Sequence, residues 1–154
     1  MSPESVRLKI AEVSLATVAP ETLPGWAAGA LVAGLDTPAM RELAGSPPSE
    51  ADEARRLLDQ AASELGIAVP DLPECRRLLV NQWATQIVAG DLPPEVGARR
   101  IWVQSSEARA NGEAAPDAWL AFANDASDWD ELPDRRSEIR ASIVSAAQSL
   151  VRDE

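Results

Sequence analysis

Residues 49–65, SEADEARRLLDQAASEL, carry the pattern that decides the fold class of this 154-residue chain. Their apolar side chains recur at intervals of three and four residues, which places them on one face of an α-helix. They are Ala54, Leu57, Leu58, Ala61, Ala62 and Leu65. Ser49 and Asp52 resemble a capping box, and Gly66 follows where a left-handed residue commonly ends a helix. The stretch therefore predicts one amphipathic helix.

A common type of helix start recurs along the rest of the chain, in which a polar or acidic residue is followed by Pro, often with a Leu between them. The sites are Ser2-Pro3, Thr22-Leu23-Pro24, Thr37-Pro38, Asp71-Leu72-Pro73, Asp91-Leu92-Pro93 and Glu131-Leu132-Pro133. Pro fits the first turn because the N–H it lacks would have no intrahelical partner there. Gly45 and Gly90, like Gly66, follow apolar periodic segments and are expected to end helices.

These signals predict helices over residues 72–89, 93–109 and 117–123, and a C-terminal helix that includes residues 139–150. The first 35 residues fit two patterns. Val6, Leu8 and Ile10 alternate as in a strand, whereas Val6, Ile10 and Val13 share a helical face, and Ser2-Pro3-Glu4 favours the helix.

The composition points to the same fold class, because 28 residues are Ala, the strongest helix former. We expect an all-α protein, a single irregular helical bundle of six or seven helices. The length suits one domain over residues 1–154.

Catalytic side chains are scarce. The chain has no His, no Tyr and one Cys, Cys75, so it lacks most groups that act as bases near neutral pH or bind zinc. Cys75 shares a predicted helix side with Leu72 and Leu79, which favours a buried apolar role over a nucleophile. No Gly-rich phosphate loop occurs. We expect no enzymatic activity, no catalytic residue and no cofactor.

The acidic residues 124–134 allow two interpretations, a calcium site and a solvated loop. An EF-hand loop needs oxygen ligands at positions 1, 3 and 5, but a register that starts at Asp128 puts Leu132 at position 5. No register fits, and no metal site is predicted, although weak binding of a divalent ion by clustered carboxylates stays open.

The formal net charge of −11, from 25 Asp and Glu against 14 Lys and Arg, repels phosphate groups. We therefore expect neither nucleic acid nor an anionic membrane as a partner. The first 20 residues lack a signal-peptide pattern, and a lone Cys cannot form an internal disulfide. These features predict a cytoplasmic protein, and they leave a homo-oligomer open.

Four Arg pairs stand at positions 55–56, 76–77, 99–100 and 135–136. Each lies in the first half of a predicted helix, where a cation gains nothing from the helix dipole. We expect them to form ion pairs with neighbouring acids, such as Asp52, Asp59, Glu95 and Glu138.

The acidic segment, residues 113–134, contains seven acids, no basic residue and the aromatic residues Trp119, Phe122 and Trp129. One interpretation is structural, with Trp119 and Phe122 in the core and the acids as helix caps or solubilising groups. The other is a surface that captures a basic protein, with Trp129 in a predicted loop as its anchor. The candidate partner-binding residues are Asp125, Asp128, Trp129, Asp130 and Glu131.

Three segments of the chain resemble a group of small uncharacterised acidic all-α bacterial proteins. They comprise Leu43-Ala44-Gly45; the set Trp83, Ile87, Gly90, Pro94, Gly97, Ala98, Arg99, Ile101 and Trp102; and the set Ser127, Trp129, Glu131, Pro133 and Arg136. The resemblance implies a helical fold and no particular activity. Gly97 within a helix would allow a close helix crossing, with Ile101 and Trp102 one turn further on.

The leading hypothesis is a non-catalytic protein-binding protein, an immunity or antitoxin-like neutraliser of a basic partner. One alternative is a small-molecule-binding bundle in which Trp83, Trp102 and Trp119 line a pocket. The other is a structural assembly module.

Overall fold

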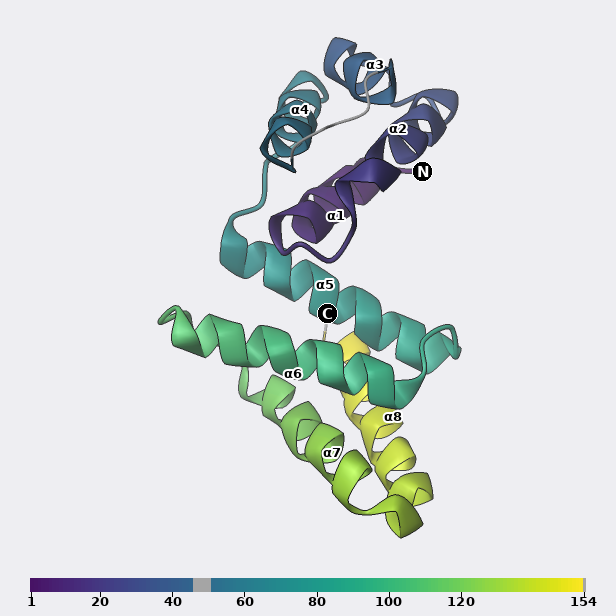
Figure 1. Ribbon diagram of the computed structural model, residues 1–154, viewed down its shortest axis with the longest axis vertical. Coiled ribbons are helices and arrows are strands. Elements are labelled where there is room, and N and C mark those ends of the chain that lie inside the picture. The colour runs from purple at the N-terminus through teal and green to yellow at the C-terminus, as the bar shows by residue number, and fades with distance from the viewer. Residues whose placement is uncertain (46–50, 154) are drawn as a thin grey trace. The chain divides into compact units, whose positions relative to one another are not determined.

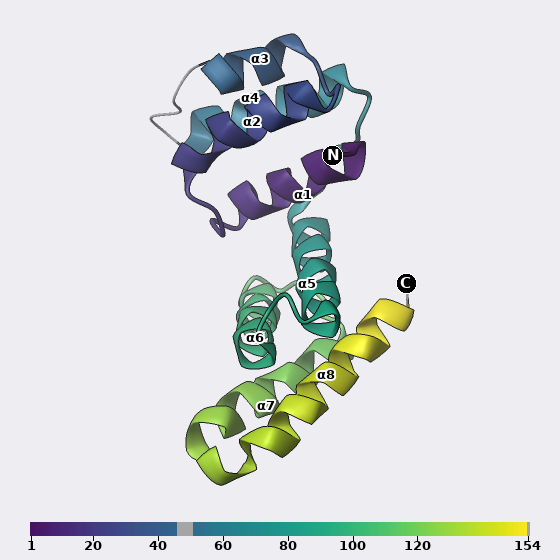
Figure 2. The same ribbon diagram turned by 90° about the vertical axis from the view of Figure 1, so that its right-hand side faces the viewer.

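The computed structural model describes residues 1–45 and 51–153, and over these ranges the chain is all-α, as predicted (Figures 1 and 2). It contains eight α-helices, slightly more than the six or seven expected, and no strand within the described ranges. The helices are α1 (Pro3–Ser14), α2 (Leu23–Val32), α3 (Pro38–Gly45), α4 (Ala51–Glu64), α5 (Leu72–Ala89), α6 (Pro94–Ala110), α7 (Leu120–Glu131) and α8 (Arg136–Arg152). Three short 3-10 helices, η1 (Pro20–Thr22), η2 (Asp117–Trp119) and η3 (Pro133–Arg135), precede α2, α7 and α8.

The helix starts predicted from Pro are confirmed, although the one at Pro133 begins η3 rather than α8. At the first start, the Ser2 backbone N–H donates to Ser5 Oγ at 2.9 Å. Val6 and Ile10 are fully buried on one face of α1, so the helical interpretation of this segment is correct and the strand alternation is not.

Two of the three predicted Gly helix ends are confirmed. Gly66 and Gly90 have φ angles of 69° and 83°, the left-handed region that Gly adopts without a Cβ penalty. Gly45 differs, because it is the last helical residue of α3 and is not left-handed. The predicted capping residue Ser49 lies outside the described residues.

The chain divides into two compact units, Met1–Leu78 and Leu79–Glu154, with the boundary inside α5. The single folding domain expected from the length stays a prediction. In the first unit, α2 packs on α3, and α4 packs on both α3 and α1. Its core is made of small and medium aliphatic side chains, among them Ile10, Leu23, Met40, Leu43 and Leu58, all fully buried.

In the second unit, α6, α7 and α8 pack on one another, and Figure 2 shows α8 running alongside α7. Ile101 of α6, Phe122 of α7 and Ile143 of α8 are fully buried, one from each helix. This packing fixes the neighbours of the acidic segment, because α7 carries most of that segment.

Gly97 marks a close approach within the second unit. A Cβ built on Gly97 would lie 2.5 Å from Ile87 Cδ1, 2.7 Å from Ile87 Cγ1 and 3.1 Å from Leu92 Cδ2. Ile87 and Leu92 are themselves buried, so they have little room to yield. The close contact expected from Gly97 is present, and its partners are Ile87 and Leu92.

We expect Gly97→Ala to lower the free energy of unfolding by about 1–2 kcal/mol, because overpacking outweighs the gain in helix propensity. Gly29→Ala is the matched control, since a Cβ at this helical position in α2 would meet only Met1 Cε, at 3.7 Å. That change should raise stability by roughly 0.5–1 kcal/mol. Urea unfolding measures both, and equal stabilisation by the two variants would contradict the close packing at Gly97.

Candidate functional site

Trp129 lies in the last turn of α7 and not in a loop, which corrects the sequence prediction. Helix α7 runs to Glu131, eight residues beyond the predicted end at Ala123, because the interior of the unit holds Phe122 and Ala126, which are 0% and 3% exposed. Phe122, Ala126 and Trp129 follow helical spacing, a signal that the surrounding Asp and Ser residues obscured.

The five candidate residues do not share one face. Asp125, Asp128 and Trp129 lie three and four positions apart and occupy one side of α7, whereas Asp130 and Glu131 point to other sides. Asp125 accepts a hydrogen bond from Ser142 Oγ of α8 at 2.9 Å, and Asp130 Oδ2 lies 2.7 Å from Arg99 Nη2 of α6. Two of the four candidate carboxylates are therefore committed to contacts within the unit.

Trp129 is half-buried and contacts two Arg side chains of α8. The guanidinium groups of Arg136 and Arg140 lie 5.1 and 5.3 Å from the centre of its ring, and Arg136 Nε donates to the Trp129 carbonyl at 3.2 Å. Such cation–π contacts are attractive at this distance. The i, i+4 spacing of the two Arg residues was the available signal, because it places them on one side of a helix.

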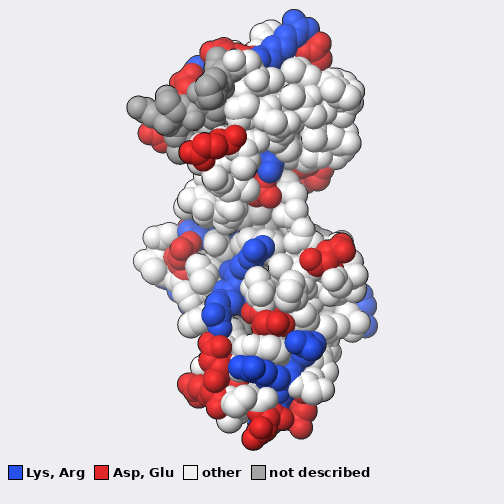
Figure 3. Space-filling view, turned by 45° about the vertical axis from the view of Figure 1, so that its right-hand side comes forward, with Lys and Arg blue, Asp and Glu red and all other residues white. Residues whose placement is uncertain are grey.

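A pocket of about 500 Å³ opens beside Trp129. It is lined by Glu95, Val96, Arg99, Arg100, Trp129 and Asp130, which come from α6 and α7. Figure 3 shows acidic and basic atoms intermingled on the visible face of this unit, in place of the uniformly acidic surface that the segment suggested. The structure thus brings cations of α6 and α8 to the acidic segment.

The three Trp residues of the alternative pocket have different environments. Trp83 and Trp119 are buried, whereas Trp102 is 41% exposed. The Arg100 guanidinium lies 5.9 Å from the centre of the Trp83 ring, so a side chain of the protein already makes a cation–π contact with this ring.

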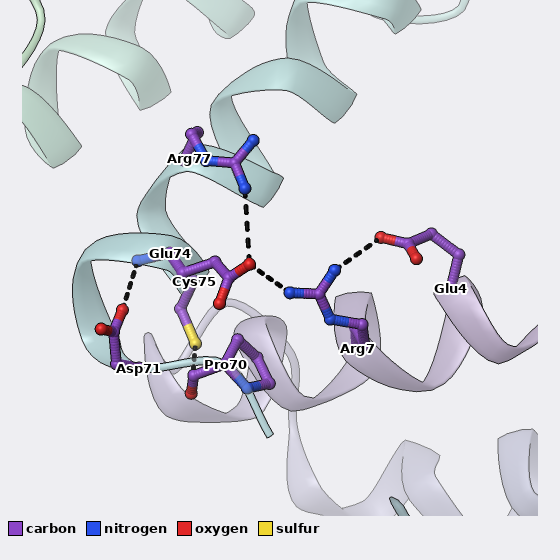
Figure 4. Close-up of polar contacts among 7 residues, drawn as sticks. All are labelled: Glu4, Arg7, Pro70, Asp71, Glu74, Cys75 and Arg77. Atoms are coloured by element: carbon purple, nitrogen blue, oxygen red, sulfur yellow. Dashed lines mark hydrogen bonds and ion pairs between the residues drawn. The ribbon is translucent and has the colours of Figure 1, made fainter. Parts of the chain in front are cut away.

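Cys75 is buried, as predicted, in the first unit (Figure 4). Its sulfur lies 3.7 Å from the Pro70 carbonyl oxygen and 3.8 Å from Ser14 Oγ. Burial raises the pKa of the Cys75 thiol above its ordinary value, which keeps the thiol protonated and unreactive.

The polar groups beside Cys75 form an ion-pair cluster at the start of α5. The Glu74 carboxylate pairs with Arg7 of α1 and lies 3.4 Å from Arg77 Nη2 (Figure 4). The Asp71 carboxylate accepts from the Glu74 backbone N–H at 2.9 Å and so caps this helix. The charged side chains around the thiol therefore have a structural role, as ion pairs and as a helix cap.

The described part of the chain lacks two further features. No group of three or more Cys, Asp and Glu side chains is arranged to hold a metal ion there. None of the helices described is both long and apolar enough to cross a bilayer.

Asp125 gives a pH-dependent prediction. Burial raises its pKa, the nearby charge of Asp128 adds to this, and the Ser142 hydrogen bond opposes it. An acid whose pKa is raised by folding contributes stability below its ordinary pKa and loses that contribution as the pH rises through the raised value.

We therefore expect the stability of Asp125→Asn relative to the parent chain to increase as the pH is raised from about 3 to about 7. Urea unfolding at several pH values measures the difference. Asp117→Asn removes an exposed carboxylate of the same segment and serves as the control. Parallel pH profiles for Asp125→Asn and the parent chain would show that burial of this carboxylate has no energetic effect.

No protein-family model matches the chain, and neither a curated protein nor a solved structure is similar to it. The resemblance based on residues 83–102 and 127–136 therefore stays a prediction.

Proposed function

We propose that this chain is a non-catalytic cytoplasmic binding protein that captures a basic protein partner, in the manner of an immunity or antitoxin-like neutraliser. The observation that carries the proposal is the end of α7, where Asp128, Asp130 and Glu131 occupy the last turn and no basic residue accompanies them. The negative end of the helix dipole makes each carboxylate there unfavourable by about 0.3–1 kcal/mol.

Contacts within the unit offset only part of this repulsion. Arg99 neutralises Asp130, and Arg136 binds the Trp129 carbonyl. Asp128 and Glu131 form no ion pair with any residue in the described ranges. Charges that oppose local stability without a compensating contact are typical of functional sites.

These two carboxylates suit the capture of a cationic surface. Unpaired acids retain their field, which accelerates the approach of a basic partner and weakens with added salt. Trp129 lies between them in sequence, and its half-buried ring, held by Arg136 and Arg140, supplies a rigid aromatic contact of the kind that dominates binding energy at interfaces.

A second candidate function is self-assembly, as a structural module. Trp102 and Val103, adjacent on α6, are 41% and 42% exposed, and large exposed apolar side chains are common at subunit interfaces. A mass that rises with protein concentration in sedimentation experiments would favour this candidate over capture of a different protein.

The proposal is tested by the double variant Asp128→Asn/Glu131→Gln. These changes leave Asp125 and Asp130 in place, because both make internal contacts whose loss would confuse the result. The double variant should bind a partner captured by the parent chain about tenfold more weakly, with a shallower salt dependence. It should also be more stable to urea by roughly 0.3–1 kcal/mol for each carboxylate removed.

Glu21→Gln/Asp91→Asn is the matched control, since it changes the net charge equally at exposed positions outside the acidic segment. It should leave partner affinity unchanged. Affinity and salt dependence that are the same in both double variants and in the parent chain would overturn the proposal, even if the stability gain is found.

A further inference from the structure

The pocket beside Trp129 contains an acid and a base, Glu95 and Arg99, that do not pair with each other. Glu95 and Arg99 are four residues apart on α6, the spacing and order at which an acid and a base normally form an ion pair. Here Arg99 reaches Asp130 of α7 instead, at 2.7 Å. The cation nearest Glu95 in the described part of the chain is Arg140 of α8, whose Nη2 lies 3.9 Å from Glu95 Oε1.

The Glu95 carboxylate lacks hydrogen-bond donors among the described residues. Its Oε2 is buried without a partner, and the distance from Oε1 to Arg140 is too long for a hydrogen bond. The side chain is only 25% exposed. A largely buried carboxylate without donors is unfavourable, and its accessible oxygen, Oε1, suits a ligand that brings N–H groups.

Arg99 lines the same pocket and has unused donors. Arg99 binds Asp130 through one N–H, and its side chain remains 53% exposed. A guanidinium carries five N–H groups in a planar fork that matches a carboxylate. Arg100 also lines the pocket, and its contact with the Trp83 ring restricts its position.

Two apolar surfaces also line the pocket. Trp129 contributes an indole ring supported by Arg136 and Arg140, and Val96, 38% exposed, contributes a branched side chain. The volume of about 500 Å³ falls within the range of small-molecule sites. Of the charged side chains that line the pocket, Arg99 and Arg100 balance Glu95 and Asp130, so a ligand without net charge is the best electrostatic match.

We infer that this pocket binds a small zwitterion with a flat apolar side group, the chemistry of an aromatic α-amino acid. The ligand ammonium binds Glu95, its carboxylate binds Arg99 and Arg100, and its ring packs on Trp129 and Val96. This site shares Trp129 with the surface proposed to capture a basic protein, but it does not include Asp128 or Glu131, on which that capture depends.

Three small molecules test the inference on the intact chain: L-phenylalanine, 3-phenylpropanoate, which lacks the ammonium group, and 2-phenylethylamine, which lacks the carboxylate. Binding is followed by the NMR signal of the Trp129 indole N–H, identified by its loss in Trp129→Phe. L-Phenylalanine should bind at least about tenfold more tightly than either analogue, the usual effect of losing a hydrogen bond to a charged group.

Variants on α6 assign the two ends of the ligand. Glu95→Gln should weaken L-phenylalanine about tenfold and leave 3-phenylpropanoate unaffected, whereas Arg100→Gln should weaken L-phenylalanine and leave 2-phenylethylamine unaffected. Arg109→Gln, an exposed Arg on the same helix that does not line the pocket, should change none of these affinities. Circular dichroism checks that each variant remains helical.

The inference is overturned if no ligand shifts the Trp129 signal at its solubility limit, or if all three bind equally. It is also overturned if Glu95→Gln weakens 3-phenylpropanoate as much as L-phenylalanine. None of these outcomes bears on the proposed partner, because Glu95 and Arg100 lie outside the acidic end of α7.

Discussion

The small size of the buried side chains is the constraint on which the packing of this protein depends. Many core positions hold Ala, and the fully buried side chains of the described residues include only one aromatic, Phe122. Hydrophobic burial and dispersion both require atomic contact, so helices with Ala on their inner faces have to approach closely. Gly97, with Ile87 against it, is the extreme case of this close approach.

Close packing in the second unit also determines the electrostatics of α7. Helix α7 contacts both α6 and α8, which brings Arg99, Arg136 and Arg140 to a segment that contains no basic residue of its own. The result is a surface with two parts. One is a pocket lined by side chains of both charges, and the other is a helix end at which Asp128 and Glu131 form no ion pair among the described residues.

The sequence predicts features of the fold that depend on neighbours along the chain. Helix α5 has the predicted bounds, and the expected ion pairs Arg55–Asp59 and Arg135–Glu138 are present, because capping, Pro and i, i+3 or i, i+4 contacts are local. Features that depend on distant residues could not be predicted. The Arg99–Asp130 pair spans 31 positions, and the length of α7 depends on tertiary burial of Phe122 and Ala126, which outweighed its loop-like composition.

The acidic last turn of α7 has an evolutionary consequence. Random substitution at positions 128 and 131 would mostly replace a carboxylate with a residue better suited to the end of a helix. Selection for stability alone would therefore remove both carboxylates over time. Their persistence in descendants of this chain would indicate selection for binding, and their gradual loss would indicate a lineage in which the partner has disappeared.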